Sequence, residues 1–197
     1  AAPCQFELAP SFERASVSSD HNMLLMQVLD EECKKRELVA LFHEKPFAHV
    51  NGSGKHTNWS LATDTGENLF SAGAHPHDNL QFLFFFTAFI RAVSLHNAVL
   101  RAHIACPGNE FRLGGMEAPP AIISVFVGEQ LEQLVRSIVD GTVPHSPGAG
   151  ALDLGVASLP KLRRDVADRN RTSPLAFVGD RFEFRAVGSS QNPANPI

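Results

Sequence analysis

The sequence predicts an α+β fold in which a curved antiparallel sheet is flanked by helices. Two observations lead to this prediction. Short stretches of alternating polar and apolar residues recur along the 197-residue chain, and longer segments with apolar residues at helical spacing lie between them. Because successive side chains of a strand point to opposite faces, the alternating stretches indicate half-buried strands. Hairpins that alternate with long helices are typical of an α+β domain.

The first expected helix spans residues 20–38. Apolar residues between 24 and 29 recur at helical spacing, and the acidic run 30–32 precedes the basic run 34–36 by three to four positions. Opposite charges at that spacing stabilise a helix surface.

The second expected helix spans about residues 79–101. Asp78 is expected to cap its N-terminus, because Gln81 follows three residues later as in a capping box. The segment from Phe82 to Val93 is apolar almost all round, so this helix is expected to be buried.

The remaining elements are shorter. Strands are expected at residues 4–9, 39–42, 56–63 and 121–127, a helix at 129–139, and a closing hairpin of Phe177 with 182–187 around Gly179 and Asp180. Residues 140–155 are rich in glycine and proline and are expected to form a flexible loop.

The stretch from Asn51 to Ser60 is the most informative part of the chain. It begins with a turn of small residues, in which glycine lets a ligand approach the backbone. On the strand that follows, His56, Asn58 and Ser60 would share one face. An imidazole, an amide and a hydroxyl in a row favour one wall of a polar active site.

Two other stretches alternate in the same way. Residues 181–185 place arginine, glutamate and arginine on one face and two phenylalanines on the other. Residues 5–8 place Gln5 and Glu7 opposite two apolar residues. An amphipathic surface strand gives the same pattern, but three such stretches in one chain favour a site.

These residue types suit a particular chemistry. Glu7, His56 and Glu183 offer oxygen and nitrogen donors without thiolate, which suits Mg²⁺ or Mn²⁺ better than structural zinc. Arg181 and Arg185 carry forked donors suited to phosphate and carboxylate. A divalent metal beside paired arginines is what phosphoryl transfer requires, because charge must be neutralised on the transferring oxygens.

Five motifs occur in an order that matches a known family. They are His-Glu-Lys-Pro-Phe at 43–47, Val-Asn-Gly-Ser-Gly-Lys-His at 50–56, Glu-Ala-Pro-Pro-Ala at 117–121, Arg-Asn-Arg at 169–171 and Phe-Glu-Phe-Arg at 182–185. In these motifs the chain resembles glutamine synthetase, and the Gly-Lys-His-Thr-Asn-Trp-Ser variant at 54–60 is most similar to the type III branch.

The resemblance implies roles for individual residues. It implies metal ligands at Glu7, His56 and Glu183, ATP contacts at Asn58, Ser60, Arg171 and Arg181, and substrate contacts at Asn51, Gly52, Arg112 and Arg185. It also implies catalytic roles for Arg171 and for Glu117, which matches a flap glutamate that helps to deprotonate ammonium.

The implied reaction joins ammonia to L-glutamate to give L-glutamine at the expense of ATP. In the family, the glutamate γ-carboxylate attacks the γ-phosphate of ATP, and ammonia then displaces phosphate from the γ-glutamyl phosphate. The resemblance further implies Mg²⁺ or Mn²⁺, a ring-shaped homo-oligomer (a dodecamer in the family) and a location in the cytoplasm, or in an organelle of a eukaryote.

The resemblance also implies an incomplete domain. Residues 1–197 are expected to be part of the catalytic domain of that family, without its N-terminal β domain, its C-terminal remainder and further carboxylates of the first metal site. The chain alone is therefore expected to be inactive. Three alternatives stay open: a non-catalytic or truncated subunit, a ligase that attaches another amine to glutamate, and a metal-dependent sugar- or acid-binding β-barrel.

Composition excludes several classes of partner. A net charge of −4 gives no basic footprint for nucleic acid. No apolar run reaches the roughly 18 residues of a membrane span, so no membrane partner is expected.

The three cysteines, Cys4, Cys33 and Cys106, are widely spaced and odd in number, which is typical of free thiols in a reducing compartment.

Two other motif-like stretches are set aside. The glycine-rich turn at 52–55 lacks the first glycine of a phosphate loop, and Phe47 stands where a zinc protease that began at His43 would need its second histidine. The roles of His43, Glu44, Lys45, His75 and His77 stay open.

Overall fold

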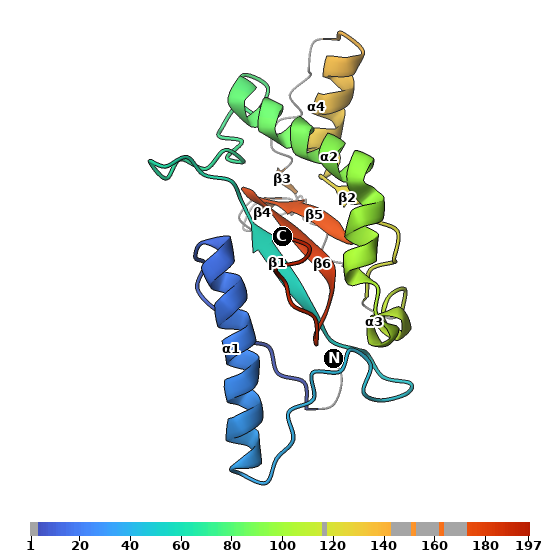
Figure 1. The fold of residues 1–197 in the computed structure, drawn as a ribbon. Helices are drawn as coiled ribbons and strands as arrows, with labels where there is room; N and C mark the ends of the chain where they lie inside the picture. Colours follow the sequence, from blue (N-terminus) through green and yellow to red (C-terminus); the bar gives the residue numbers. More distant parts are fainter. Residues whose placement is uncertain (1–3, 116–117, 143–150, 153–161, 164–172) are drawn as a thin grey trace.

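The computed structural model describes residues 4–115, 118–142, 151–152, 162–163 and 173–197 (Figure 1). The helices are α1 (Ala15–Lys34), α2 (Leu80–Ile104), α3 (Pro107–Arg112) and α4 (Glu129–Val139). The strands are β1 (Gly54–Trp59), β2 (Val125–Phe126), β3 (Ala151–Leu152), β4 (Leu162–Arg163), β5 (Leu175–Val178) and β6 (Arg181–Gly188). Helices beside an open sheet confirm the expected α+β class.

The main sheet has four strands in the order β1-β6-β5-β2. β6 lies between β1 and β5 and is antiparallel to both, as expected. The pairing of β2 with β5 is parallel, so the expectation of a wholly antiparallel sheet is wrong at this edge. A parallel pair requires a long crossover, and the chain between β2 and β5 contains α4 and a separate two-stranded ladder of β3 and β4.

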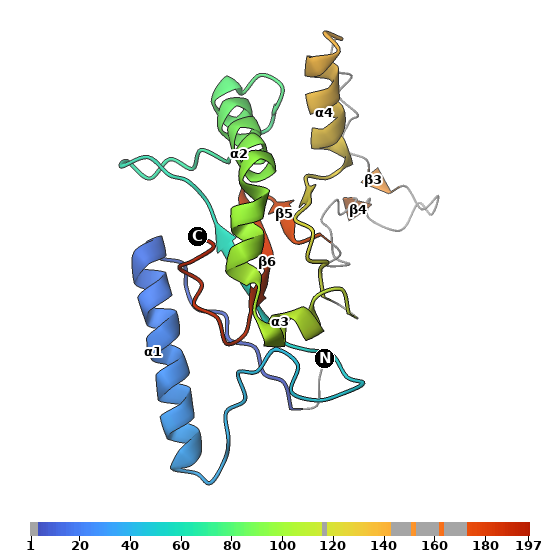
Figure 2. The same ribbon diagram turned by 45° about the vertical axis from the view of Figure 1, so that its right-hand side comes forward.

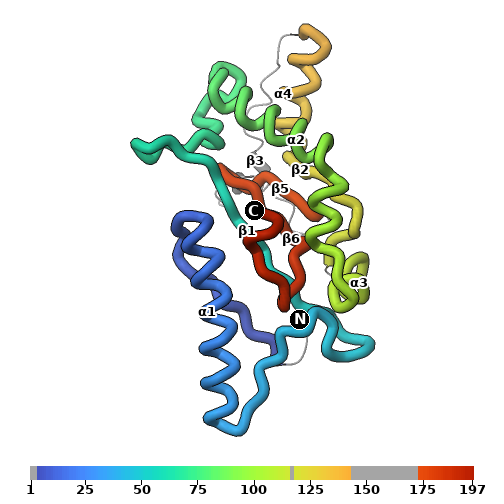
Figure 3. Tube along the Cα trace, viewed as in Figure 1, coloured from blue at the N-terminus to red at the C-terminus, as the bar shows by residue number. Residues whose placement is uncertain are grey.

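β1 and β6 lie side by side although they are far apart in the sequence (Figure 3). The hairpin of β5 and β6 turns through Gly179 and Asp180, with Val178 paired to Arg181, as the sequence predicts. Gly179 has a φ of 72°, and a glycine with positive φ at the first turn position is typical of two-residue hairpins.

The core forms where α2 lies on the sheet (Figure 2). Phe82 and Phe86 of α2 contact Phe177 of β5, with ring centroids 6.0 and 5.1 Å away. Phe182 of β6 is fully buried, and its ring centroid lies 4.3 Å from that of Phe89. Each buried phenylalanine contributes about 2–3 kcal/mol of hydrophobic free energy, so this aromatic contact attaches the helix to the sheet.

The prediction that α2 is buried all round is wrong. Phe84 is 66% exposed and Leu95 is 65% exposed, because α2 covers one sheet and the described residues place nothing over its far side. Its N-cap is Asn79, whose side-chain oxygen accepts from Phe82 N at 3.0 Å, and not the expected Asp78. Among the described helices, α2 alone is long and apolar enough to cross a membrane. This is weak evidence for a membrane span, because core helices meet the same two criteria.

Two expected strands are absent from the described structure. Residues 5–9 and 39–42 form neither helix nor strand, and Val39 is 79% exposed. A strand is stable only when a neighbouring strand takes up its backbone hydrogen bonds, and neither segment has such a neighbour among the described residues. The strand expected at 121–127 is reduced to β2.

The other helices follow the sequence more closely. α1 begins at Ala15 and ends at Lys34, earlier at both ends than expected, and Glu37 beyond it has a φ of 57°. The expected charge pairs are present in the last part of α1: Lys34 Nζ lies 2.5 Å from Asp30. α4 has the expected bounds. The loop expected at 140–155 lies largely outside the described residues, which include a turn at 140–142 and β3.

Candidate active site

The polar face of β1 is as the sequence predicts. His56 and Asn58 lie on the exposed side of the strand, and Lys55, Thr57 and Trp59 alternate to the more buried side. The ladder with β6 contains an irregularity between Lys55 and Thr57, at the position of His56. Bulges of this kind re-aim a side chain, and they are frequent beside active sites.

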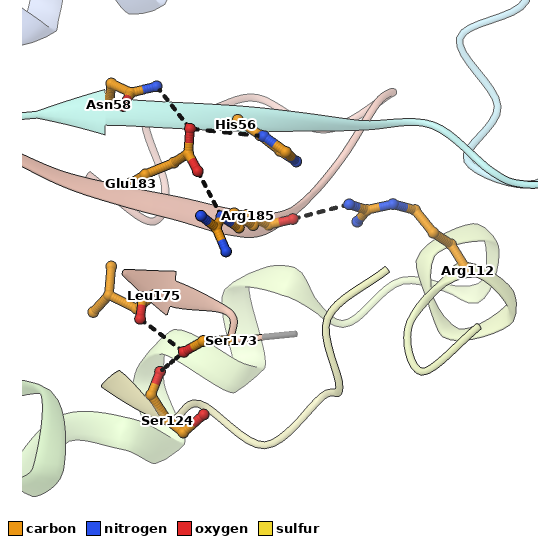
Figure 4. A network of polar contacts seen from close by, with 8 residues as sticks. All are labelled: His56, Asn58, Arg112, Ser124, Ser173, Leu175, Glu183 and Arg185. Atoms are coloured by element: carbon orange, nitrogen blue, oxygen red, sulfur yellow. Dashed lines mark hydrogen bonds and ion pairs between the residues drawn. The ribbon is translucent and has the colours of Figure 1, made fainter. Parts of the chain in front are cut away.

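Glu183 is the centre of a polar cluster that joins the two strands (Figure 4). Asn58 is paired with Glu183 in the ladder, and its Nδ2 donates to Glu183 Oε1 at 3.3 Å. His56 Nδ1 lies 3.8 Å from the same oxygen. Arg185 Nε donates to the other oxygen, Oε2, at 2.5 Å. The structure therefore brings together four of the predicted site residues.

Electrostatics keep the Glu183 carboxylate charged. Burial acts to raise the pKa of Glu183, but the hydrogen bond from Arg185, the attraction to His56 and the hydrogen bond from Asn58 outweigh burial and lower it. The carboxylate is thus a half-buried anion at neutral pH, held in one orientation by two donors. Such a group can ligate a cation or orient a charged substrate.

Arg112 supports this cluster from α3. Its Nη2 donates to the carbonyl oxygen of Arg185 at 2.9 Å, and its Nη1 donates to Asn109 Oδ1 at 3.0 Å. Burial lowers the pKa of this guanidinium, and attraction to Glu44 opposes the shift. A Cβ on Gly54 would lie 2.2 Å from Arg112 Nη2, so a side chain there would displace the guanidinium. Arg112 is therefore a buried brace between α3 and β6.

Residues 51–54, which we call the substrate loop because the family resemblance implies substrate contacts at Asn51 and Gly52, lie next to Arg112. Gln5 Nε2 donates to the carbonyl oxygen of Gly52 at 3.5 Å, and Ser53 N donates to the carbonyl oxygen of Glu44 at 2.8 Å. Asn51 is half-buried. The loop leads directly into β1, which links its position to that of His56.

Lys55 is another ionisable group next to the substrate loop. Its Nζ donates to the carbonyl oxygen of Gln191 at 2.5 Å and to the sulfur of Met26 at 3.0 Å. Burial lowers the pKa of Lys55 to about 8, and attraction to Glu44 opposes part of the shift. This ammonium joins α1 and the C-terminal segment to the sheet.

Some predicted site residues lie apart from the cluster. Arg181, at the start of β6, is exposed and pairs with Asp180 at 3.6 Å. Ser60 is exposed, directly after β1. Glu117 and Arg171 lie outside the described residues.

Glu7 does not join His56 and Glu183. Its segment makes no strand, and neighbouring Phe6 is 89% exposed, so no burial holds Glu7 against the sheet. Across the described part of the chain, no three His, Cys, Asp or Glu side chains gather closely enough to hold a metal ion. The described residues therefore do not gather the three expected metal ligands: the His56 and Glu183 donors meet, and Glu7 lies apart from them.

Sequence reasoning left out two buried residues that shape the site. Asn109 is fully buried, and its Nδ2 donates to the carbonyl oxygens of Ile104 and Ala186 at 2.7 and 2.9 Å. Glu44, whose role the sequence left open, is 2% exposed. The sequence signal for Asn109 was a polar residue beside Gly108, which is too common to single out, and the signal for Glu44 was its place in the motif at 43–47, which does not indicate burial.

Other expectations concern groups away from the cluster. Cys4, Cys33 and Cys106 are free, as expected. His75 and His77 lie with their ring centroids 6.0 Å apart, and His77 Nε2 is 3.3 Å from the exposed Asp78 carboxylate.

A further polar contact lies at the β2 edge of the sheet. Ser173 Oγ donates to the carbonyl oxygen of Ser124 at 3.2 Å and connects the segment before β5 to the segment before β2 (Figure 4).

The chain is similar to known proteins over most of its length. It is 57% identical over 190 residues to the Type-3 glutamine synthetase of Dictyostelium discoideum, covering 96% of this chain and 26% of that protein. It is 48% identical over 197 residues to a glutamine synthetase of Bacteroides fragilis, covering 98% of this chain and 27% of that protein. A glutamine synthetase of Butyrivibrio fibrisolvens is 46% identical over 189 residues, with 96% of this chain and 27% of that protein covered.

The chain thus spans about a quarter of the length of the curated relatives it matches. A family model described as the catalytic domain of glutamine synthetase matches residues 1–106, which include β1 and the substrate loop. This match covers more than half of the chain, and the relatives extend the similarity through the β5–β6 hairpin. The chain belongs to the glutamine synthetase family.

Proposed function

We propose that the natural polypeptide carrying this chain joins ammonia to L-glutamate with hydrolysis of ATP, to give L-glutamine. The observation that carries the proposal is the cluster of His56, Asn58, Glu183 and Arg185 on the adjacent strands β1 and β6. It combines a held carboxylate, an imidazole and a guanidinium, which are the groups that phosphoryl transfer to a carboxylate needs.

The chain's residues divide between two substrates in this proposal. Asn51, Gly52, Arg112 and Arg185 belong to the glutamate side, and Asn58, Ser60, Arg171 and Arg181 belong to the ATP side. Arg185 Nε donates to Glu183 Oε2. A guanidinium has five N–H donors in a rigid fork, a geometry that matches a substrate carboxylate.

The chemistry proceeds in two displacements. A glutamate γ-carboxylate oxygen bonds to the γ-phosphorus of ATP while the bond to ADP breaks, and the ADP oxygen leaves as an anion. Ammonia then bonds to the γ-carbonyl carbon, and inorganic phosphate leaves with its electron pair and takes up the proton that the attacking nitrogen loses. Glu117 takes the proton that makes ammonia from ammonium, and Arg171 meets the charge on the phosphate oxygens.

The donor set also supports a divalent cation. His56 and Glu183 would hold Mg²⁺ or Mn²⁺, which suits their nitrogen and oxygen donors and their separation of 3.8 Å. When bound, the ion supplies charge neutralisation to the phosphate oxygens. Glu7 would join them only if residues 5–9 take a different position from the one described.

We also propose an oligomeric state and a cellular location for the whole polypeptide: a homo-oligomeric ring in the cytoplasm, as the family resemblance implies. Equilibrium sedimentation of the purified polypeptide and fractionation of its source cells test these two statements.

The activity is tested by γ-glutamyl hydroxamate formation with ATP and Mg²⁺ or Mn²⁺. In the natural polypeptide, Glu183→Gln removes the charge and replaces one of the two acceptor oxygens, which receive Asn58 and Arg185, with an NH2 group. We therefore expect turnover to fall at least about a hundredfold. His77→Ala, outside the cluster, is the matched control and should leave turnover unchanged. Near-normal turnover in Glu183→Gln would refute the role of Glu183.

A second candidate is a subunit or part that lacks activity by itself. It is favoured by the two-donor metal site, since Glu7 does not reach the cluster in the described residues. The same assay on the natural polypeptide separates the two candidates, because glutamyl hydroxamate formation there supports the first and its absence supports the second. The isolated 197 residues should give no product, and turnover by this chain alone would contradict the second candidate.

A further inference from the structure

Glu44 is a buried carboxylate outside the polar cluster. It is 2% exposed and lies in the segment between α1 and β1. Its Oε1 accepts from Ser190 N at 2.9 Å and from Ser190 Oγ at 2.5 Å. Both donors belong to the segment directly after β6, so one side chain joins two distant parts of the sequence.

Three glycines surround Glu44 closely. A Cβ on Gly108 would lie 2.3 Å from Glu44 Oε2, and a Cβ on Gly188 would lie 2.4 Å from Oε1. A Cβ on Gly52 would lie 2.2 Å from the carbonyl oxygen of the same residue. Because real Cβ atoms do not approach other atoms so closely, a side chain at any of the three positions would displace Glu44.

The backbone of Glu44 also holds the substrate loop. Its carbonyl oxygen accepts from Ser53 N at 2.8 Å. Two cations, the half-buried Lys55 and the buried Arg112, experience its negative charge. Lys55 follows the loop, and Arg112 touches both Gly54 and the backbone of Arg185. Glu44 therefore acts on the loop through its own backbone and on two cations that adjoin the loop.

We infer that Glu44 is a positioning residue, which fixes the substrate loop relative to the end of β6 through Ser190 and the three glycines. A buried charge is stable only with hydrogen-bond partners, so its two bonds to Ser190 define a single position for the loop. The kinetic consequence rests on the proposed function, because it assigns Asn51 and Gly52 to the glutamate side. Loss of Glu44 then weakens glutamate binding and leaves ATP binding intact.

The close packing of Glu44 against the glycines is tested by melting temperatures, which require no enzyme assay. Gly108 lies in α3, where alanine normally stabilises a helix, so Gly108→Ala should raise the melting temperature unless the new methyl group meets Glu44. We expect Gly108→Ala to lower the melting temperature of the natural polypeptide by several degrees. In a Glu44→Ala background, the same substitution should raise it by about 2–4 °C. The same sign in both backgrounds would overturn the inference.

The positioning part is tested by steady-state kinetics of the same polypeptide. Glu44→Ala should raise the KM for glutamate about tenfold and leave the KM for ATP unchanged, which corresponds to the loss of a charge-assisted hydrogen bond. Glu44→Gln keeps an acceptor for Ser190 and should raise that KM less. Glu110→Gln replaces an exposed glutamate of α3 and should change neither KM.

The two parts fail in different ways. Equal increases of both KM values in Glu44→Ala and Glu44→Gln, or a loss of kcat alone, would overturn the positioning role. If the unsubstituted polypeptide forms no glutamine, the proposed function fails. The melting-temperature comparison of Gly108→Ala in the two backgrounds still decides whether Glu44 fixes the loop.

Discussion

Polar and apolar residues alternate in the same way in β6 and in residues 5–8, but of these two segments only β6 is a strand. β6 has a partner on both sides, and its Phe182 is fully buried under α2. In the other segment, Phe6 is 89% exposed, and Gln5 Nε2 donates to the carbonyl oxygen of Gly52 in the loop before β1.

The comparison shows what alternation can and cannot predict. It specifies which residues share a face if a strand forms, and in β1 and β6 it correctly grouped His56 with Asn58 and Glu183 with Arg185. It does not specify whether a neighbouring strand is available to take up the backbone hydrogen bonds. Glu7 was assigned to the metal site on alternation and resemblance alone, and it is the residue that the structure leaves apart.

Removing one aromatic ring from each segment should give the largest difference in stability between the two. Phe182→Ala should lower the free energy of unfolding by about 3–5 kcal/mol, because it leaves a cavity beside the rings of Phe89 and Phe177. Phe6→Ala should change it by less than about 0.5 kcal/mol. Urea denaturation of both variants measures the difference, and similar losses would show that residues 5–8 pack on the sheet after all.

Arg185→Lys tests whether the polar face of β6 works as a fork. Lysine keeps the charge but cannot donate to Glu183 and to a substrate carboxylate in the fixed geometry of a guanidinium. In the natural polypeptide we expect the KM for glutamate to rise about tenfold, from the loss of one charge-assisted hydrogen bond. Steady-state kinetics check this, and an unchanged KM would speak against a clamp.

The end of α2 that faces the sheet offers a smaller test. Asn79→Ala should cost about 1 kcal/mol of stability, because the cap to Phe82 N is lost. Asp78→Ala, at the position that the sequence favoured, should cost almost nothing. Denaturation of the two variants compares them directly, and a larger cost for Asp78→Ala would reverse the assignment of the cap.

The smallest expected effect is a pH dependence. Burial acts to raise the pKa of Glu44, but its bonds to Ser190 outweigh burial and lower it. A carboxyl group whose pKa is lowered by folding stabilises the folded state at pH values above its ordinary pKa. This stabilisation is lost as the pH falls through the lowered pKa. The stability difference between wild type and Glu44→Gln should therefore shrink between roughly pH 6 and 3, and a constant difference would contradict this.

Local sequence patterns predicted the parts of the fold that depend on local interactions. The hairpin follows from Gly179, and α4 follows from helical spacing within its own residues. What the patterns missed depends on contacts between distant segments. The parallel direction of β2, the exposed side of α2 and the burial of Glu44 against Ser190 are all set by residues far away in the sequence.

We propose that His56 and Glu183, from adjacent strands, bind the same cation. Water-proton relaxation of Mn²⁺ bound to the natural polypeptide measures its affinity directly. We expect His56→Ala and Glu183→Gln each to weaken Mn²⁺ binding at least about tenfold, and His77→Ala to have no effect. Unchanged Mn²⁺ affinity in the variant that carries both His56→Ala and Glu183→Gln would contradict it.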